Sequence, residues 1–537
     1  MRKIISVFMV LCMLCAAFAG CAKNADQTNA PVKEPDADPG ISANAAPNPS
    51  AQTENEGKQP EQQSPGSGAQ ALSGGTVIDG INYVMIYNPY IYDENNEAQT
   101  LNSMRYTGDI GWQIETGLFR ADETEEPPAF PGTIPQKDLN KDFDDSVVNR
   151  EGDRAGANDP VYYAGDTHSF FAYDSTMTMR VRKNFECVYE GTHCYIWSTD
   201  GSIGKDDAET LAYEFDNLIY ENNAACFGTP RFTENGGKIN ILFYPLEQEG
   251  LLGFFTRYDI FSSAEAPSDV AEYYGINTDH AIITLNSKYI ETDMPSMKAT
   301  LAHEFQHMIC ASEAFYYYDS PFVRSWLDEA MSSYAEELNY PGTKYDRLYH
   351  LYMFFSDCCG KGQSLYHFNG DDPWIGSYGV VFLYETYLTE QAGADVFKNV
   401  HSYWRNSYSS SVDEADALLA SVSPDFAARI SDAYDYPASV SLGFGDAAEE
   451  WMSKLTLDFY IQSLRPELNK CGEYADRAYT AMLYSEMDPL YIEGGGRIIV
   501  SPENGSFTIP NDSGNGLVYV GLDSNFNVVS ITYTEAD

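Results

Sequence analysis

The chain has 537 residues, more than a single hydrophobic core usually supports, so two or more folded units are expected. Its 32 Lys and Arg residues face 80 Asp and Glu residues, which gives a formal net charge of −48 at pH 7. This balance argues against nucleic-acid binding and against electrostatic adsorption to an anionic bilayer, and it favours solubility.

The N-terminus has the pattern of an export signal. Two basic residues precede an apolar run from Ile4 to Phe18, which is too short to span a bilayer comfortably, and small residues lead to Cys21. The Ala-Gly-Cys ending resembles that of a bacterial lipoprotein signal. The resemblance implies that residues 1–20 are removed, that Cys21 is lipidated and that the protein is anchored outside the cytoplasm by lipid alone. An ordinary secretory signal is the alternative.

Two regions of different composition follow the signal. Residues 21–75 are rich in small and polar residues and cannot bury enough apolar surface to fold, so we expect a disordered tether. Residues 76–205 alternate β-branched and aromatic residues between turn signals, which predicts a β-rich N-terminal region. An acidic loop inside it carries alternating Asp and Asn residues, but Phe143 stands where a calcium loop needs glycine, so a calcium site is disfavoured.

Residues 206–465 have the pattern of an α+β catalytic region. Apolar spacing predicts a helix at about 206–223, and two predicted strands follow, the second at 281–286. Helices predominate after these strands, as in α+β proteins. Residues 466–537 alternate between turn signals, which predicts a small C-terminal β unit.

The cysteines do not indicate a metal module. Seven cysteines follow Cys21, an odd number without a Cys-x-x-Cys pair. Neither a cysteine-zinc site nor a complete disulfide framework is implied, and a bridge between Cys187 and Cys194 is left open.

A His-Glu-x-x-His motif stands at residues 303–307. On a helix, His303 and His307 share one face and can bind one ion, while Glu304 faces a water on that ion. Chance gives at most roughly two such matches per hundred chains of this composition. Leu301 and Phe305 would anchor the helix in a core, which a pair of surface histidines would not need. The motif therefore predicts a catalytic metal site.

A catalytic zinc ion needs a third protein ligand and one open position. Glu313 lies six residues after His307, but it continues along the same helix and would stand about 9 Å past that histidine. Glu329 lies on a second predicted helix that starts after Ser320-Pro321, next to an apolar stripe that would face the first helix. We therefore predict Glu329 as the third ligand, with a solvated Asp328–Glu329 pair as the alternative.

HEFQHM followed by the glutamate of WLDEAMSSYAEE is similar to the gluzincins, and most similar to the hyicolysin family of secreted zinc metallopeptidases. The likeness covers about residues 160–465. It implies a gluzincin-like unit, a Zn²⁺ cofactor held by His303, His307 and Glu329, and protein or peptide substrates. It also implies Glu304 as the general base that later protonates the leaving amine.

The resemblance extends to two further features. Tyr378, in the "GSYGVV" stretch, is implied as a donor to the reaction's oxyanion, with His367 and His401 as weaker candidates. The strand at 281–286 is implied as a substrate-pairing edge.

The resulting prediction is a lipid-anchored zinc endopeptidase. An aminopeptidase is the nearest enzymatic rival, although no GxMEN-like segment precedes the motif helix. A non-catalytic peptide- or surface-binding lipoprotein on a peptidase fold is the rival of another class.

Overall fold

The computed structural model describes part of the chain: residues 70–72, 75–89, 103–106, 147–149, 160–199, 201–233, 236–248, 250–317, 325–341, 375–399, 418–420, 447–470, 490–500, 502, 505–510 and 516–534. The chain divides into two compact units, Met1–Lys58 and Gln59–Asp537, and all described residues belong to the second. The predicted signal, Cys21, most of the tether, the acidic loop's alternating Asp and Asn residues, His367 and His401 lie outside the described residues.

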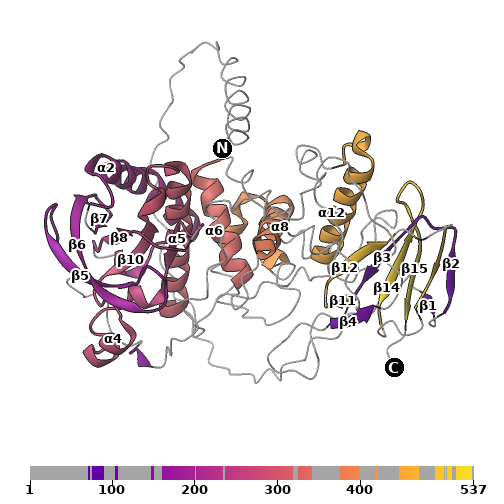
Figure 1. Ribbon diagram of the computed structural model, residues 1–537, viewed down its shortest axis with the longest axis horizontal. Coiled ribbons are helices and arrows are strands. Elements are labelled where there is room, and N and C mark those ends of the chain that lie inside the picture. Colours follow the sequence, from indigo (N-terminus) through magenta and orange to yellow (C-terminus); the bar gives the residue numbers. More distant parts are fainter. Residues whose placement is uncertain are drawn as a thin grey trace, which may run out of the picture. The chain divides into compact units, whose positions relative to one another are not determined.

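A six-stranded mixed sheet lies in the part that contains the histidine motif (Figure 1). Its strands, in spatial order, are β5 (Thr167–Tyr173), β6 (Arg180–Glu190), β7 (Cys194–Ser198), β8 (Ile239–Tyr244), β10 (Ala281–Asn286) and β9 (Gly253–Phe255). Strands β7, β8 and β10 are parallel to one another, and the other pairings are antiparallel. β8 and β10 are buried at every position, as expected for apolar strands covered on both faces.

The position of β10 corrects one sequence-based expectation. Strand 281–286 was predicted to offer a free edge to a substrate, but β10 pairs with β8 on one side and with β9 on the other. The prediction was wrong because β9 has only three residues, too few to stand out as a period-2 pattern. The outer strand on this side of the sheet is β9.

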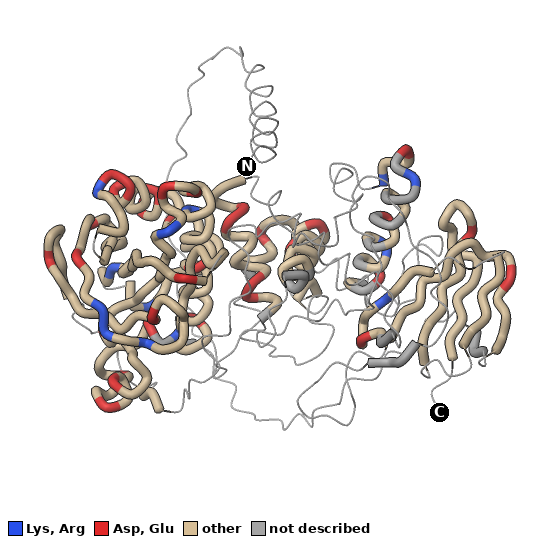
Figure 2. The backbone as a smooth tube through the Cα atoms, viewed as in Figure 1, with Lys and Arg blue, Asp and Glu red and all other residues tan. Residues whose placement is uncertain are grey.

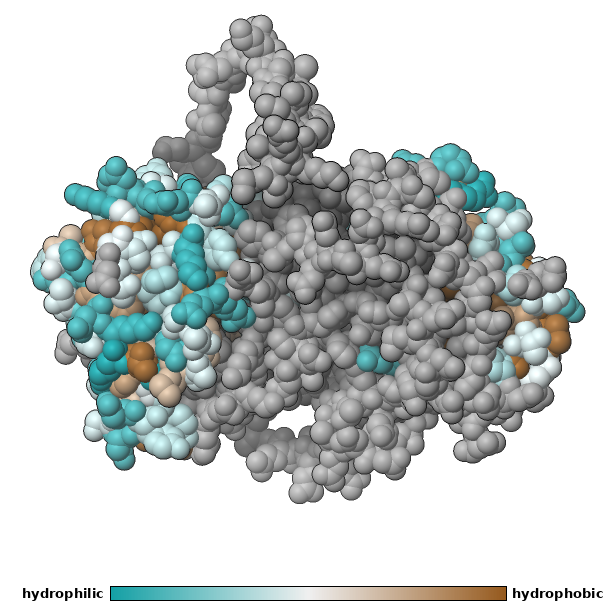
Figure 3. Space-filling model, viewed as in Figure 1, coloured by the Kyte–Doolittle hydropathy of each residue, from teal (hydrophilic) through white to brown (hydrophobic). Residues whose placement is uncertain are grey.

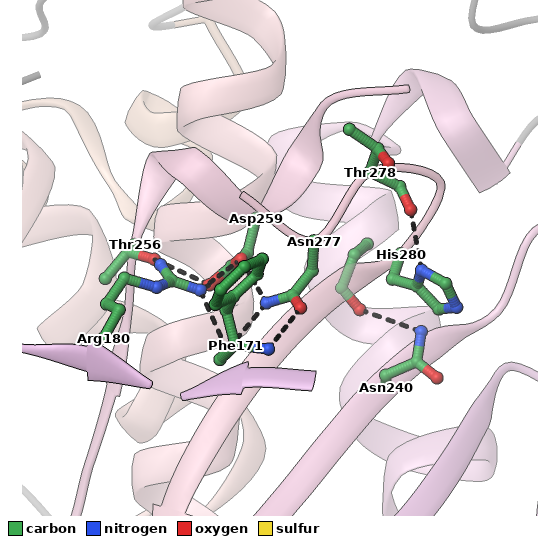
Figure 4. Close-up of polar contacts among 9 residues, drawn as sticks. Phe171, Arg180, Asn240, Thr256, Asp259, Asn277, Thr278 and His280 are labelled. Carbon is green, nitrogen blue, oxygen red and sulfur yellow. Dashed lines mark hydrogen bonds and ion pairs between the residues drawn. The ribbon is translucent and has the colours of Figure 1, made fainter. Parts of the chain in front are cut away.

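The sheet curls until β5 meets the segment before β10. The Asn277 side chain accepts a hydrogen bond from the Phe171 amide at 2.7 Å and donates one to the Phe171 carbonyl at 2.8 Å. A buried ion pair lies beside this contact, with Arg180 Nη2 2.6 Å from Asp259 Oδ1 (Figure 4). Thr256, directly after β9, accepts from Arg180 and donates to Asp259. The cluster ties the β5–β6 hairpin to the chain that leaves β9.

Helices cover one face of this sheet, and an aromatic core fills the other. The aromatic core includes Phe170, Phe185, Trp197, Tyr244 and Phe254. The helices of this part are α2 (Lys205–Glu214), the π-helix η3 (Phe215–Ile219), α3 (Tyr220–Phe227), α4 (Ser268–Tyr274), α5 (Met294–Tyr317), α6 (Ser325–Asn339) and α8 (Ile375–Ala392). α2 and α5 contact the sheet directly, α6 packs on α5, and α8 packs on α6. Short 3₁₀ turns are η4 (Arg231–Thr233), η5 (Arg257–Ile260), η6 (Ser287–Tyr289) and η8 (Ala394–Asn399).

The predicted helix at 206–223 is confirmed and extends to Phe227. α2, η3 and α3 follow one another without a break, and Gly228 ends the run with a φ of 101°. A positive φ of this kind is open to glycine at little cost, which explains why the helix stops there.

A second sheet joins strands from both ends of the described chain. Its spatial order is β1 (Gln70–Leu72), β15 (Val528–Thr534), β14 (Val518–Leu522), β3 (Tyr83–Tyr87) and β12 (Arg497–Val500). Two strand pairs accompany it, β11 (Leu490–Glu493) with β4 (Ser103–Tyr106) and β13 (Ser506–Thr508) with β2 (Val77–Asp79). α12 (Ala447–Leu464), followed by η9 (Pro466–Leu468), packs on this sheet through Leu457 and Ile461.

Residues 76–205, which composition groups as one region, therefore supply strands to four sheets, the two large ones and the two strand pairs. Strands up to Tyr106 pair with the C-terminal strands, whereas strands from Thr167 on join the sheet near the histidine motif. Alternation reveals that a strand exists but not its partner, so these long-range pairings could not be read from the sequence. The mixture of helices and sheets agrees with the predicted α+β class.

The described surface is mixed in character. Asp and Glu residues are spread over many elements, including α2 and α12 (Figure 2). On the face shown in Figure 3, the described residues are mostly hydrophilic, with smaller apolar areas between them. Within the described part, no helix has the length and apolar character needed to cross a bilayer.

Candidate metal centre

Helix α5 presents both motif histidines from one face. The opposite face is fully buried through Leu301, Phe305 and Met308, so the helix is fixed in the core and cannot rotate freely. His303 and His307 are 7 % and 9 % exposed. Their Nε2 atoms lie 3.1 Å apart, one helical turn from each other.

Glu329 reaches the same point from α6. Its Oε2 atom lies 3.4 Å from His303 Nε2 and 3.7 Å from His307 Nε2. A point equidistant from these three atoms in their common plane is about 2 Å from each, the bond length that zinc takes with imidazole nitrogen and carboxylate oxygen. The three side chains thus fit a zinc ion in donor type and in spacing.

Two carboxylates and one hydroxyl contact the remaining ring nitrogens. His303 Nδ1 lies 2.7 Å from Glu336 Oε1, and His307 Nδ1 lies 3.1 Å from Asp328 Oδ2 and from Ser332 Oγ. Because a carboxylate only accepts, it places the ring proton on Nδ1 and leaves the Nε2 lone pair for a metal. Glu336 and Asp328 were not predicted as partners, although Glu336 follows Glu329 by two helical turns and lies on the same face.

The electrostatics of the metal-free centre favour a cation. Burial lowers the pKa of His307, but the carboxylates of Asp328 and Glu329 outweigh burial and raise that pKa to about 9. Without metal, His307 is therefore protonated on both ring nitrogens and positively charged at neutral pH. A bound metal ion would replace this proton as the positive charge among the carboxylates.

The other predicted residues do not belong to this group of three. Glu304, 2 % exposed, is on α5 directly after His303 and is not one of the converging donors. Glu313 does not belong to the group either. Tyr378, 9 % exposed, lies on α8. The same helix packs on α6, where the rings of Tyr384 and Trp326 lie 4.3 Å apart at an angle of 35°. The role of Tyr378 in catalysis stays a prediction.

The described cysteines do not contribute. Cys187 and Cys194, for which a bridge was left open, are free thiols. Cys310 is also free and buried one turn after His307. Burial, and then the nearby Asp328, raise the pKa of its thiol well above the usual range, so it is not a ready thiolate ligand.

Comparison with known proteins gives one informative relative. No protein-family model matches the chain. A curated relative, the neutral metalloprotease ShpI of Staphylococcus hyicus, is 27 % identical over 248 residues, which cover 44 % of this chain and 54 % of the relative. The chain thus spans about half the length of that relative. This distant similarity supports assignment to a metallopeptidase family, in agreement with the geometry of the three donors.

Proposed function

We propose that the protein is a zinc-dependent endopeptidase of the hyicolysin-like gluzincin type. The observation that carries the proposal is the convergence of His303 Nε2, His307 Nε2 and Glu329 Oε2 on one point at zinc bonding distance. The similarity to a neutral metalloprotease supports the same activity. An extracytoplasmic lipoprotein anchored through Cys21 is the proposed setting, supported by the N-terminal sequence alone.

Each residue of the centre has a separate role in the proposed hydrolysis. Zinc bound to His303, His307 and Glu329 would supply Lewis acidity and a water acidic enough to react near neutral pH. Glu304 accepts the proton of the attacking water and delivers it to the leaving amine. Tyr378 donates a hydrogen bond to the oxyanion. Glu336 and Asp328 hold the two imidazoles in the orientation that binds the ion.

An extended peptide is proposed to pair with the outer strand β9 rather than with β10. β9 lies against α5 so closely that a Cβ atom added to Gly253 would stand 2.9 Å from Thr300 Cγ2, three residues before His303. Pairing through the backbone would bring a peptide bond beside the centre with little dependence on side chains.

The test is cleavage of an unstructured protein by the purified enzyme, with and without a chelator. We expect internal cleavage that stops on chelation and returns with zinc. Glu304→Gln should lower the rate by about 10²- to 10⁴-fold while keeping bound zinc, because it removes the base and not a ligand. An unchanged rate in Glu304→Gln would contradict the mechanism.

Two peptide substrates separate the rivals. Cleavage of peptides with blocked N-termini supports an endopeptidase, whereas a requirement for a free N-terminus would identify an aminopeptidase. Stoichiometric zinc without cleavage of any peptide would favour a binding protein on a peptidase fold.

A further inference from the structure

The helical run from α2 to α3 lies behind the metal helix, on the side away from the histidine nitrogens. The rings of Phe215 and Tyr220 pack on Phe305 of α5 at centroid distances of 5.1 and 5.5 Å. One turn further, Asn223 is fully buried and its Nδ2 donates to the Ala302 carbonyl at 2.9 Å. This carbonyl belongs to the residue directly before His303.

The same asparagine reaches the helix that carries Glu329. Asn339, at the end of α6, donates from Nδ2 to Asn223 Oδ1 at 2.8 Å and to the Ala335 carbonyl at 2.7 Å. Asn222 Nδ2 donates to Asn339 Oδ1 at 3.2 Å. Ala335 directly precedes Glu336, so the amide bridge touches each helix one residue before a member of the His303–Glu336 pair.

Two links between α5 and α6 therefore run side by side. One is the 2.7 Å contact between His303 Nδ1 and Glu336 Oε1, and the other is the chain of amides through Asn223 and Asn339. A buried amide whose donor and acceptor are both used fixes the position of its partners, because any sliding of the helices breaks bonds that water cannot replace.

We propose that Asn223 is a positioning residue for the metal centre: it fixes the register of α5 against α6 so that Glu336 meets His303. The inference rests on the proposed zinc site, and Asn223 touches neither the ion nor the substrate. If Asn223 has this role, replacing it should weaken zinc binding because Glu336 no longer meets His303. This loss should exceed what a general loss of stability would cause.

The test compares Asn223→Ala with Asn240→Ala. Asn240 is buried to a similar degree and also bridges elements, since it accepts from Trp197 Nε1 at 2.9 Å and donates to the Ala281 carbonyl at 3.3 Å, but it belongs to the curled sheet (Figure 4). Zinc affinity is measured by competition with a chromophoric chelator, at a temperature where circular dichroism shows each variant folded. We expect about a tenfold or larger loss for Asn223→Ala and less than a twofold change for Asn240→Ala.

A double-mutant cycle with Glu336→Gln identifies the route. If Asn223 acts through Glu336, adding Asn223→Ala to Glu336→Gln changes zinc affinity by much less than tenfold. Full additivity would overturn this route. Should Asn223→Ala not fold, Asn339→Ala removes the same link from the α6 side and serves in its place.

The remaining outcomes separate this inference from the proposed function. Equal zinc affinity of the wild-type protein and Asn223→Ala would overturn the positioning role alone. An equal loss in Asn240→Ala would do the same, because the effect would then be general. A wild-type protein without zinc affinity would overturn the proposed function and the positioning role together.

Discussion

Two buried clusters of charged side chains lie in the same part of the molecule, and they are built in opposite ways. Around Asp259, the chain itself balances the buried charge, because Arg180, Thr256 and Asn277 all donate hydrogen bonds to the Asp259 carboxylate. Around His303 and His307, two imidazole nitrogens and a carboxylate oxygen face one another at 3.1 to 3.7 Å. When the ring protons are on Nδ1, all three atoms direct lone pairs to the same point, which is the arrangement that a metal ion requires.

The difference shows that burial of charge does not by itself mark a functional site. Both clusters are nearly inaccessible, with side chains 5 % and 7 % exposed at the ion pair and 9 % to 15 % exposed at His303, His307 and Glu329. What separates them is the balance of donors and acceptors. A cluster that satisfies itself stabilises the fold, whereas converging lone pairs favour a bound ion.

The largest expected effect is the loss of metal on removal of a donor. Glu329→Ala should weaken zinc affinity by at least about 100-fold, more than the 10- to 100-fold typical when a ligand loses a hydrogen-bond partner. Glu313→Ala is the matched control, because it removes another buried glutamate that does not join the three donors. In a competition titration, Glu313→Ala should keep the zinc affinity of the wild-type protein. The assignment of the third ligand fails if Glu313→Ala loses zinc affinity and Glu329→Ala keeps it.

The ion pair should respond in stability and not in metal binding. Asp259→Ala removes the carboxylate that balances the buried Arg180 charge, and breaking a buried ion pair in this way typically costs about 3–5 kcal/mol in the free energy of unfolding. Denaturant unfolding measures this loss, and zinc affinity of the folded variant should stay within about twofold of wild type. Replacing both partners, as Arg180→Met with Asp259→Leu, should recover most of the stability. A tenfold drop in zinc affinity in Asp259→Ala would contradict the conclusion that this cluster acts on stability and not on metal binding.

Zinc affinity should depend on pH. The pKa of His307, raised from 6.5 to about 9 by the carboxylates around it, means that metal binding must displace a proton below pH 9. Zinc affinity should therefore fall about tenfold for each unit from pH 8 to pH 6.5.

The metal-free protein should show the opposite trend. The raised pKa contributes stability that is fully present below about pH 6.5 and is lost as the pH rises through about 9. Thermal unfolding after chelation, across this range, checks the sign. Asp328→Asn removes one carboxylate and should shift both pH dependences to lower pH, and flat profiles in the unmodified protein would contradict the charge balance described for the centre.

The smallest effect is expected at the strand that joins the two clusters. β9 begins at Gly253 beside α5 and ends one residue before Thr256 of the ion-pair cluster. A Cβ atom at Gly253 would stand 2.6 Å from Leu285 Cδ2 and 2.9 Å from Thr300 Cγ2, so Gly253→Ala must move the strand or the helix. We expect cleavage efficiency to drop up to about tenfold with zinc content unchanged.

Gly204→Ala is the control for this variant. Gly204 has an ordinary φ of −75°, and its nearest atom to an added Cβ is Asp207 Oδ2 at 3.7 Å. An equal drop in both variants would show that β9 is not critical for substrate alignment.

The convergence of His303, His307 and Glu329 could be predicted because its signals are local. Four-residue spacing puts His303 and His307 on one helical face, and the apolar stripe beside Glu329 orients α6. Glu336 and Asn223 were not predicted because their partners are distant in the sequence. Glu336 contacts His303 across 33 residues, and Asn223 contacts Ala302 across 79 residues. A single asparagine or glutamate on a helix carries no signal of such a partner.

The strand partners could not be predicted for the same reason. β3 and β14 each read clearly as strands, yet their pairing joins Val84 to Gly521 across most of the described chain. The edge position of β9 depends on a three-residue strand that leaves almost no pattern. Local spacing therefore predicted which side chains converge at the centre better than it predicted the strand order of the sheet beside it.

Anomalous diffraction at the zinc absorption edge, from crystals of the purified protein, tests the central claim most directly. The account predicts one peak at about 2.0–2.2 Å from His303 Nε2, His307 Nε2 and a Glu329 oxygen, and no peak at the Arg180–Asp259 cluster. A zinc peak held by other residues, or well-ordered His303 and His307 rings with no peak between them in zinc-saturated crystals, would contradict it.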